Sequence, residues 1–118
     1  MATLLVGAGG VLGVLTRYGI GRMTLQTNAL VWSTVAINII GSFLLGLLVA
    51  GRWLDRDLND ALGIGFLGGF TTFSTFSVQV VLEIESGEPG RAAGYVGASV
   101  IGGIAAATAG YALGRKLA

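Results

Sequence analysis

Midway along the third apolar segment of this chain lies the sequence Gly65-Phe66-Leu67-Gly68-Gly69-Phe70-Thr71-Thr72-Phe73-Ser74-Thr75-Phe76-Ser77. It combines three glycines, five hydroxyl side chains and four phenylalanines. Glycine weakens the interior of a helix, and threonine loses rotamer freedom there. Gly68–Thr72 is therefore a poor interior for a continuous helix, although the segment around it is long and apolar enough to cross a membrane.

Backbone that leaves a helix inside a bilayer is tolerated only where it is buried in protein or lines a wet cavity. Broken helices of this kind recur at the ion and substrate sites of membrane proteins. We therefore expect a transmembrane helix that is interrupted near Gly68–Thr72, with its freed backbone facing an ion.

The composition independently indicates a membrane protein. Hydrophobic residues make up 53% of the 118 residues and charged residues only 11%, whereas a soluble domain carries about 25% charged residues. The net charge of +1 gives no indication of nucleic-acid binding. The chain has no cysteine and no histidine, which excludes disulfides, thiol catalysis and the commonest metal ligands.

Four apolar segments of membrane-spanning length follow one another, with short loops between them. They cover approximately Ala2–Ile20, Leu30–Leu54, Ala61–Leu82 and Ala92–Leu113. The first lacks a basic N-terminal region and a cleavage site, so we interpret it as a span and not as a signal peptide. The expected fold is an all-α membrane protein. It forms a single four-helix transmembrane domain over residues 1–118, with the third helix broken mid-membrane.

Polar side chains of the second segment share one helical face, because Thr34, Asn38 and Ser42 are spaced by four residues. Asn38 is the member whose burial in the membrane costs the most free energy, because an amide at mid-membrane depth needs hydrogen-bond partners. Either it forms a hydrogen bond that joins two helices, or it is a donor that lines an anion path. Alone it favours the first interpretation; beside an interrupted third helix it favours the second.

The third segment places Phe73 and Phe76 among hydroxyl residues, with Ser74 and Thr75 between them. Aromatic residues at helical spacing usually serve packing, and spacing alone favours that interpretation. The interleaved hydroxyls favour the alternative. Ring edges are electropositive, so phenylalanines presented edge-on can help to solvate a small anion.

Other positions also allow both a structural and a functional interpretation. Arg17, near the end of the first span, either reaches the membrane surface or supplies a vestibule charge that attracts anions. Tyr95 and Ser99 share one face of the fourth span with Gly103, although a serine in a helix often bonds its own backbone. The small residues of Gly9–Gly13 favour close packing against a neighbouring helix.

Basic residues are nearly balanced between the two ends of the expected helices. If the spans alternate in direction, one side carries Arg52, Arg56, Arg115 and Lys116, and the other carries Arg17, Arg22 and Arg91. Four against three is a weak bias under the positive-inside rule. Such a chain can insert in both orientations, and an antiparallel dimer would follow.

Three motifs together carry a family resemblance. They are Gly65-x-x-Gly68-Gly69-x-Thr71-Thr72-Phe73-Ser74-Thr75-Phe76 in the third span, Gly9-Gly10-x-x-Gly13-x-x-x-Arg17-Tyr18 in the first, and Asn38-x-x-Gly41-Ser42-Phe43-x-x-Gly46 in the second. They resemble the Fluc/CrcB fluoride ion channel family across three of the four spans, and the third-span motif is the specific one.

The resemblance implies an antiparallel, dual-topology homodimer with two fluoride pores in a prokaryotic cell membrane. It implies a central structural sodium ion held by backbone carbonyls at Gly68 and Thr71, and a vestibule role for Arg17. The implied pore or fluoride-binding residues are Asn38, Phe73, Ser74, Thr75, Phe76, Tyr95 and Ser99. Tyr95 and Ser99 belong to a row of polar residues along one face of the fourth span, which we call the fourth-span track. In the family the next residue of this row is often a hydroxyl residue, but here it is Gly103.

The residues themselves suit a passive anion path. Fluoride is small and strongly hydrated, so hydroxyls, an amide and backbone N–H groups must replace its water. No Asp or Glu lies inside a span, which argues against proton-coupled exchange.

Other functions fit less well. A small dual-topology multidrug exporter is the alternative, but such exporters depend on a membrane-embedded carboxylate. A non-transporting packing subunit would explain the glycines but not Asn38 and the hydroxyls. An enzyme is not indicated, because no nucleophile–base pair or metal cluster is evident.

Overall fold

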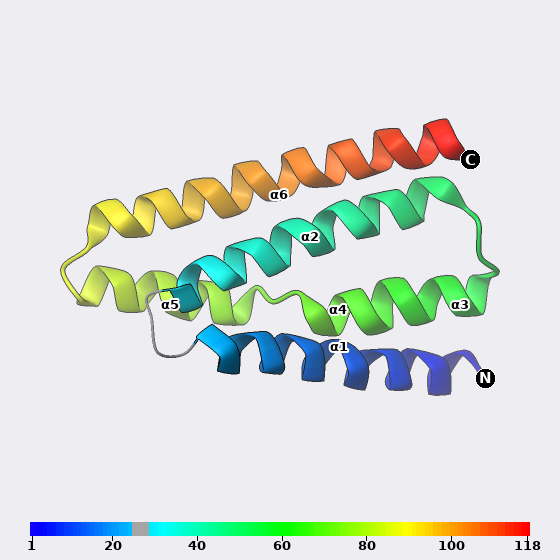
Figure 1. The fold of residues 1–118 in the computed structure, drawn as a ribbon, viewed down its shortest axis with the longest axis horizontal. Helices are drawn as coiled ribbons and strands as arrows, with labels where there is room; N and C mark the ends of the chain where they lie inside the picture. Colours follow the sequence, from blue (N-terminus) through cyan, green and yellow to red (C-terminus); the bar gives the residue numbers. More distant parts are fainter. Residues whose placement is uncertain (25–28) are drawn as a thin grey trace.

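The computed structural model describes residues 1–24 and 29–118, and within these ranges the chain forms helices without strands. Within these ranges the four long helical segments form rods that lie side by side (Figure 1). The rods are α1 (Ala2–Thr24), α2 (Ala29–Gly51), a segmented third rod and α6 (Pro89–Leu117). The third rod consists of α3 (Arg56–Asp60), η1 (Ala61–Leu67), α4 (Gly68–Phe70) and α5 (Ser74–Glu85).

Within the described residues, four helical segments are long and apolar enough to cross a membrane. They are Ala2–Met23, Trp32–Gly51, Arg56–Glu85 and Pro89–Leu117. The prediction of an all-α protein with four spans is therefore confirmed, and the chain is a multi-pass membrane protein. Its two termini lie at the same end of the molecule (Figure 1).

The ends of the helices differ from the predicted ones for local reasons. α2 ends at Gly51 rather than at Leu54, because Arg52 has a left-handed φ of 54°, the conformation that commonly terminates helices. α6 begins at Pro89, a residue tolerated at a first helical position because the N–H that it lacks would be unpaired there anyway. The predicted link over 21–28 is helical as far as Thr24, and its residues 25–28 lie outside the described residues.

Glycines allow the rods to approach at backbone distance. A side chain at Gly9 would run into the carbonyl of Ala61, and one at Gly13 into that of Phe66. These contacts join α1 to η1, and a similar contact at Gly110 joins α6 to α2. The packing interpretation of Gly9–Gly13 is thus confirmed, as expected for small residues between membrane helices.

The third rod changes its path between α4 and α5. η1 is a π-helical segment, and the helical backbone ends at Phe70 and resumes at Ser74. Thr71 is extended, with φ −87° and ψ 160°. Gly68 has ordinary helical torsion angles, φ −63° and ψ −39°, and a methyl group there would meet nothing closer than a carbonyl oxygen at 3.8 Å. The fold of a single chain therefore does not require glycine at this position.

Candidate functional site

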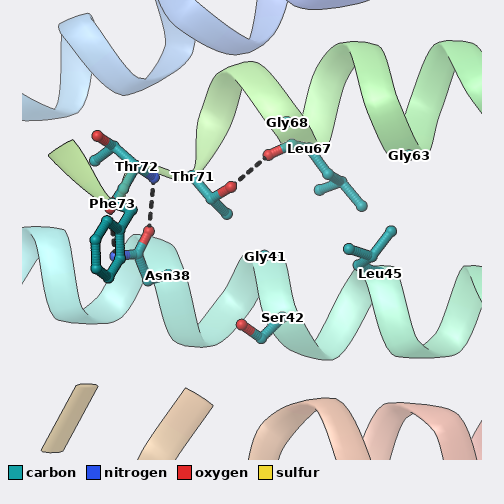
Figure 2. A pocket seen from close by; sticks show the side chains of 10 residues that line it. All are labelled: Asn38, Gly41, Ser42, Leu45, Gly63, Leu67, Gly68, Thr71, Thr72 and Phe73. Carbon is teal, nitrogen blue, oxygen red and sulfur yellow. Dashed lines mark hydrogen bonds between the residues drawn. The ribbon is translucent and has the colours of Figure 1, made fainter. Parts of the chain in front are cut away.

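Asn38 on α2 pairs with the non-helical residues of the third rod through both ends of its amide. Its Nδ2 donates to the Thr72 carbonyl at 3.0 Å, and its Oδ1 accepts from the Thr72 N–H at 3.0 Å (Figure 2). The hydrogen bonding between helices that the sequence suggested is present. An amide NH₂ carries two donor hydrogens and Thr72 uses one, so the bond does not exclude the second interpretation, a donor to an anion.

The carbonyl groups at the end of α4 differ in whether they keep a helical partner. The Leu67 carbonyl accepts from the Thr71 N–H at 3.0 Å and from the Thr71 hydroxyl at 2.9 Å. The Gly69 carbonyl accepts from Arg17 Nε at 3.2 Å. Arg17, which the sequence placed near a vestibule, thus reaches from α1 to the end of α4.

The Gly68 carbonyl loses its helical partner because the helix ends before Thr72. In a continuous helix it would accept from the N–H four residues on, which belongs to Thr72. That N–H donates to Asn38 instead. Gly68, predicted to supply a carbonyl to a cation, is therefore a residue whose usual N–H partner is bound by Asn38.

The start of α5 is capped by the same threonine. The Thr72 hydroxyl accepts from the Thr75 N–H at 3.2 Å, as side-chain oxygens commonly do at helix starts. A helix N-terminus carries a partial positive charge from its free N–H groups. The positive end of α5 therefore lies next to the Asn38–Thr72 pair.

Two cavities meet at Thr72. The first, the asparagine cavity, has a volume of about 390 Å³ and lies between α2 and the third rod, where Asn38, Gly68, Thr71 and Phe73 line it (Figure 2). The second, the arginine cavity, has a similar volume of about 390 Å³. Arg17, Tyr18, Arg22, Thr34, Thr75 and Gln79 are among its lining residues.

The two predicted pore phenylalanines have different surroundings. Phe76 is buried and meets Tyr95 edge-on, with ring centroids 5.0 Å apart. Phe73 has 78% of its surface exposed, although its ring centroid lies 6.0 Å from that of Phe76. Packing within the chain therefore gives a structural reason for an aromatic residue at position 76, but it gives none for the exposed ring of Phe73.

The predicted fourth-span track begins at a buried tyrosine. Tyr95 is fully buried, and its hydroxyl donates to Gln79 Oε1 at 2.5 Å. Ser99 Oγ is buried and, among the described residues, has no hydrogen-bond partner. Ser74 is exposed at the first position of α5. These three residues do not line either cavity at Thr72, whereas Thr75 lines the arginine cavity.

The chain is similar to known proteins over nearly its whole length. Residues 4–111 match the model of the family described as CrcB-like protein, Camphor Resistance (CrcB). This chain belongs to the CrcB family. The resemblance inferred from the three motifs is therefore confirmed.

Similar CrcB relatives carry the name fluoride-specific ion channel FluC. One from Agrobacterium fabrum is 46% identical, covering 96% of this chain and 95% of its own length. One from Caulobacter vibrioides is 41% identical, covering 97% of this chain and 95% of its own length. One from Novosphingobium aromaticivorans is 40% identical, covering 99% of this chain and 98% of its own length.

Two residues of this CrcB site were not among the predicted site residues, although Thr72 lay within the predicted helix interruption. Gln79 links Tyr95 to the arginine cavity, and its signal was present as an amide within the apolar run 78–82. Thr72 belongs to both cavities, pairs with Asn38 and caps α5. It acts largely through backbone atoms, which every residue has, so its residue type gave little signal.

Proposed function

We propose that this chain is a fluoride-selective channel that exports fluoride passively across the cell membrane. The observation that carries the proposal is the junction at Thr72, where two cavities without a lining carboxylate meet beside an amide, hydroxyls and a helix N-terminus. The names of the relatives support the same ion. The protein is thus a transporter and not an enzyme.

The chemistry of the junction suits a small, strongly hydrated anion. Arg17 and Arg22 line the arginine cavity, and like-signed charges in a cleft raise the local concentration of oppositely charged ions. Beyond them lie the Asn38 amide and the first N–H groups of α5, which can replace the water around fluoride. The absence of carboxylates from both linings disfavours a multidrug exporter that works through an embedded acid.

Liposomes that contain the purified protein and are loaded with fluoride should release it down its gradient without any imposed proton gradient. Chloride-loaded liposomes should release little in the same time, and protein-free liposomes should retain both ions. The measurement is the external fluoride or chloride concentration at an ion-selective electrode. Efflux that depends on an imposed proton gradient would identify an exchanger and contradict the proposal.

The proposed assembly is an antiparallel, dual-topology homodimer with two pores, in which Thr71–Phe73 interrupt the third span inside the membrane. The near-balance of basic residues supports insertion in both orientations. The exposed ring of Phe73 and the asparagine cavity beside it lie on one surface of the chain, where a second copy would cover them.

A structural sodium ion at the centre of that dimer is the remaining part of the proposal. The Gly68 carbonyl, deprived of its helical N–H, and the extended backbone of Thr71 would supply oxygen ligands from each chain. Among the described residues no cluster of carboxylates or imidazoles could hold a metal ion. Neutral oxygen ligands suit a hard monovalent cation better than a divalent one, which usually recruits carboxylates. Sodium would add positive potential near the pores.

A crystal structure of the purified protein, with sodium exchanged for a heavier monovalent cation, checks this assembly. We expect two antiparallel copies and an anomalous scattering peak between their Gly68–Thr71 segments. Parallel copies would contradict dual topology. An antiparallel dimer with no peak at its centre would contradict the cation site alone.

A further inference from the structure

Ser42 differs from several hydroxyl residues that bond to their own stretch of backbone. Thr16, Ser77 and Thr108 donate to the carbonyl four residues back, a common choice for a hydroxyl inside a helix. Among the described interactions, Ser42 makes no such bond to the carbonyl of Asn38. Its hydroxyl therefore keeps its donor hydrogen for something outside its own helix.

The position of Ser42 joins two cavities. It lines the asparagine cavity, one helical turn beyond Asn38. It also lines a third cavity of about 380 Å³ between α2 and α6, which we call the α6 cavity and which extends to Thr108 and Tyr111. Ser42 is thus the polar side chain at the boundary between the two spaces.

The neighbouring surface of α6 has no side chain at this level. A methyl group added to Gly103 would lie 3.7 Å from Ser42 Oγ and would meet nothing else within 4 Å. Figure 2 shows the Ser42 side chain on the face of α2 away from Thr71. One turn earlier on α6, the buried Ser99 hydroxyl has no partner among the described residues. Among the described residues on the α2 side of the α6 cavity, Ser42 is the only polar lining residue, because the others are Leu45, Gly46 and Val49.

We propose that the Ser42 hydroxyl is a further fluoride-binding group that passes the anion from the asparagine cavity to the α6 cavity. The inference rests on the proposed fluoride channel function. A hydroxyl that donates to an anion in a space of low polarity forms a charge-assisted hydrogen bond, which is stronger than one between neutral groups. At the level of Gly103, α2 therefore supplies the donor that α6 does not.

Ser42→Ala should lower fluoride efflux from liposomes about tenfold or more, the loss expected for one hydrogen bond to a charged group. Ser42→Cys has a side chain of similar size, but its thiol is a weaker hydrogen-bond donor. Its fluoride efflux should therefore lie between that of Ser42→Ala and that of the unmodified protein. The matched control is Thr16→Val, because the Thr16 hydroxyl lies on an exposed face of α1 and donates to the Leu12 carbonyl. It should conduct like the unmodified protein.

The double variant Ser42→Ala/Gly103→Ser tests whether the hydroxyl itself matters. The new β-carbon has room, and the new hydroxyl enters the same gap from α6. We expect it to recover most of the lost efflux, which a purely structural role of Ser42 would not predict.

The outcomes separate the two proposals. If the unmodified protein releases no fluoride, the proposed function itself fails. If it does but folded Ser42→Ala conducts normally, or the folded double variant recovers nothing, only the role of Ser42 is overturned. Gel filtration of each variant establishes folding, and if Ser42→Ala does not fold, normal efflux through Ser42→Cys overturns the inference instead.

Discussion

Replacing Asn38 by aspartate should reduce fluoride efflux about a thousandfold while changing the size of the side chain very little. Two unit charges about 4 Å apart repel by about 4 kcal/mol at the intermediate dielectric of a protein surface, and each 1.4 kcal/mol is about a factor of ten. Aspartate still accepts from the Thr72 N–H, but it no longer donates to the Thr72 carbonyl or to an anion. Efflux from liposomes is the measurement.

The variant Asn38→Leu separates the hydrogen bonds from the charge. It leaves both the N–H and the carbonyl of Thr72 without their partner, which costs about 1–3 kcal/mol for each buried group. Asn38→Leu should therefore lower thermal stability in detergent more than Asn38→Asp does, and it should also lose efflux. Asn59→Asp on α3 is the control for added negative charge and should conduct normally. Normal efflux through folded Asn38→Asp would leave Asn38 as a structural link between helices.

Phe73→Ile should lower fluoride efflux about tenfold or more without lowering the stability of the folded chain. The substitution keeps an apolar side chain of similar bulk but removes the electropositive ring edge. Because 78% of Phe73 is exposed, its ring is not part of the packing of a single chain. A loss of efflux in this variant would therefore not follow from a disrupted core. The measurements are liposome efflux and a thermal melt in detergent.

Phe76→Ile should have a mixed effect, because its ring packs edge-on against Tyr95. Losing that pair costs about 0.5–1.5 kcal/mol beyond the change in buried area, so stability and efflux should both fall. Phe66→Ile is the control for packing alone, since Phe66 stacks on Phe70 with centroids 5.8 Å apart. It should lower stability and preserve efflux. Full efflux through Phe73→Ile would show that this ring is not on the anion path.

Much of the fold follows from the sequence because the bilayer imposes it. A span needs about 20 apolar residues whatever lies beside it, so four spans could be recognised without knowing how they pack. An amide in an apolar segment is costly in any arrangement, so Asn38 was a candidate from its residue type alone. Glycine spacing predicted that α1 packs closely against a neighbouring helix, since small residues are what close helix packing requires, and the structure shows that this neighbour is the third rod.

The site itself was decided by tertiary contacts that residue types do not encode. Thr72 acts through a backbone N–H and carbonyl that every residue possesses, and it is Asn38 from another helix that pairs with both. Phe73 and Phe76 are identical side chains three residues apart, yet only Phe76 has Tyr95 beside it. Ser42 meets the vacant side of Gly103 only because α2 and α6 pack together. Hydropathy and residue type determine which segments enter the membrane, whereas the packing of the helices determines which polar atoms remain for an ion.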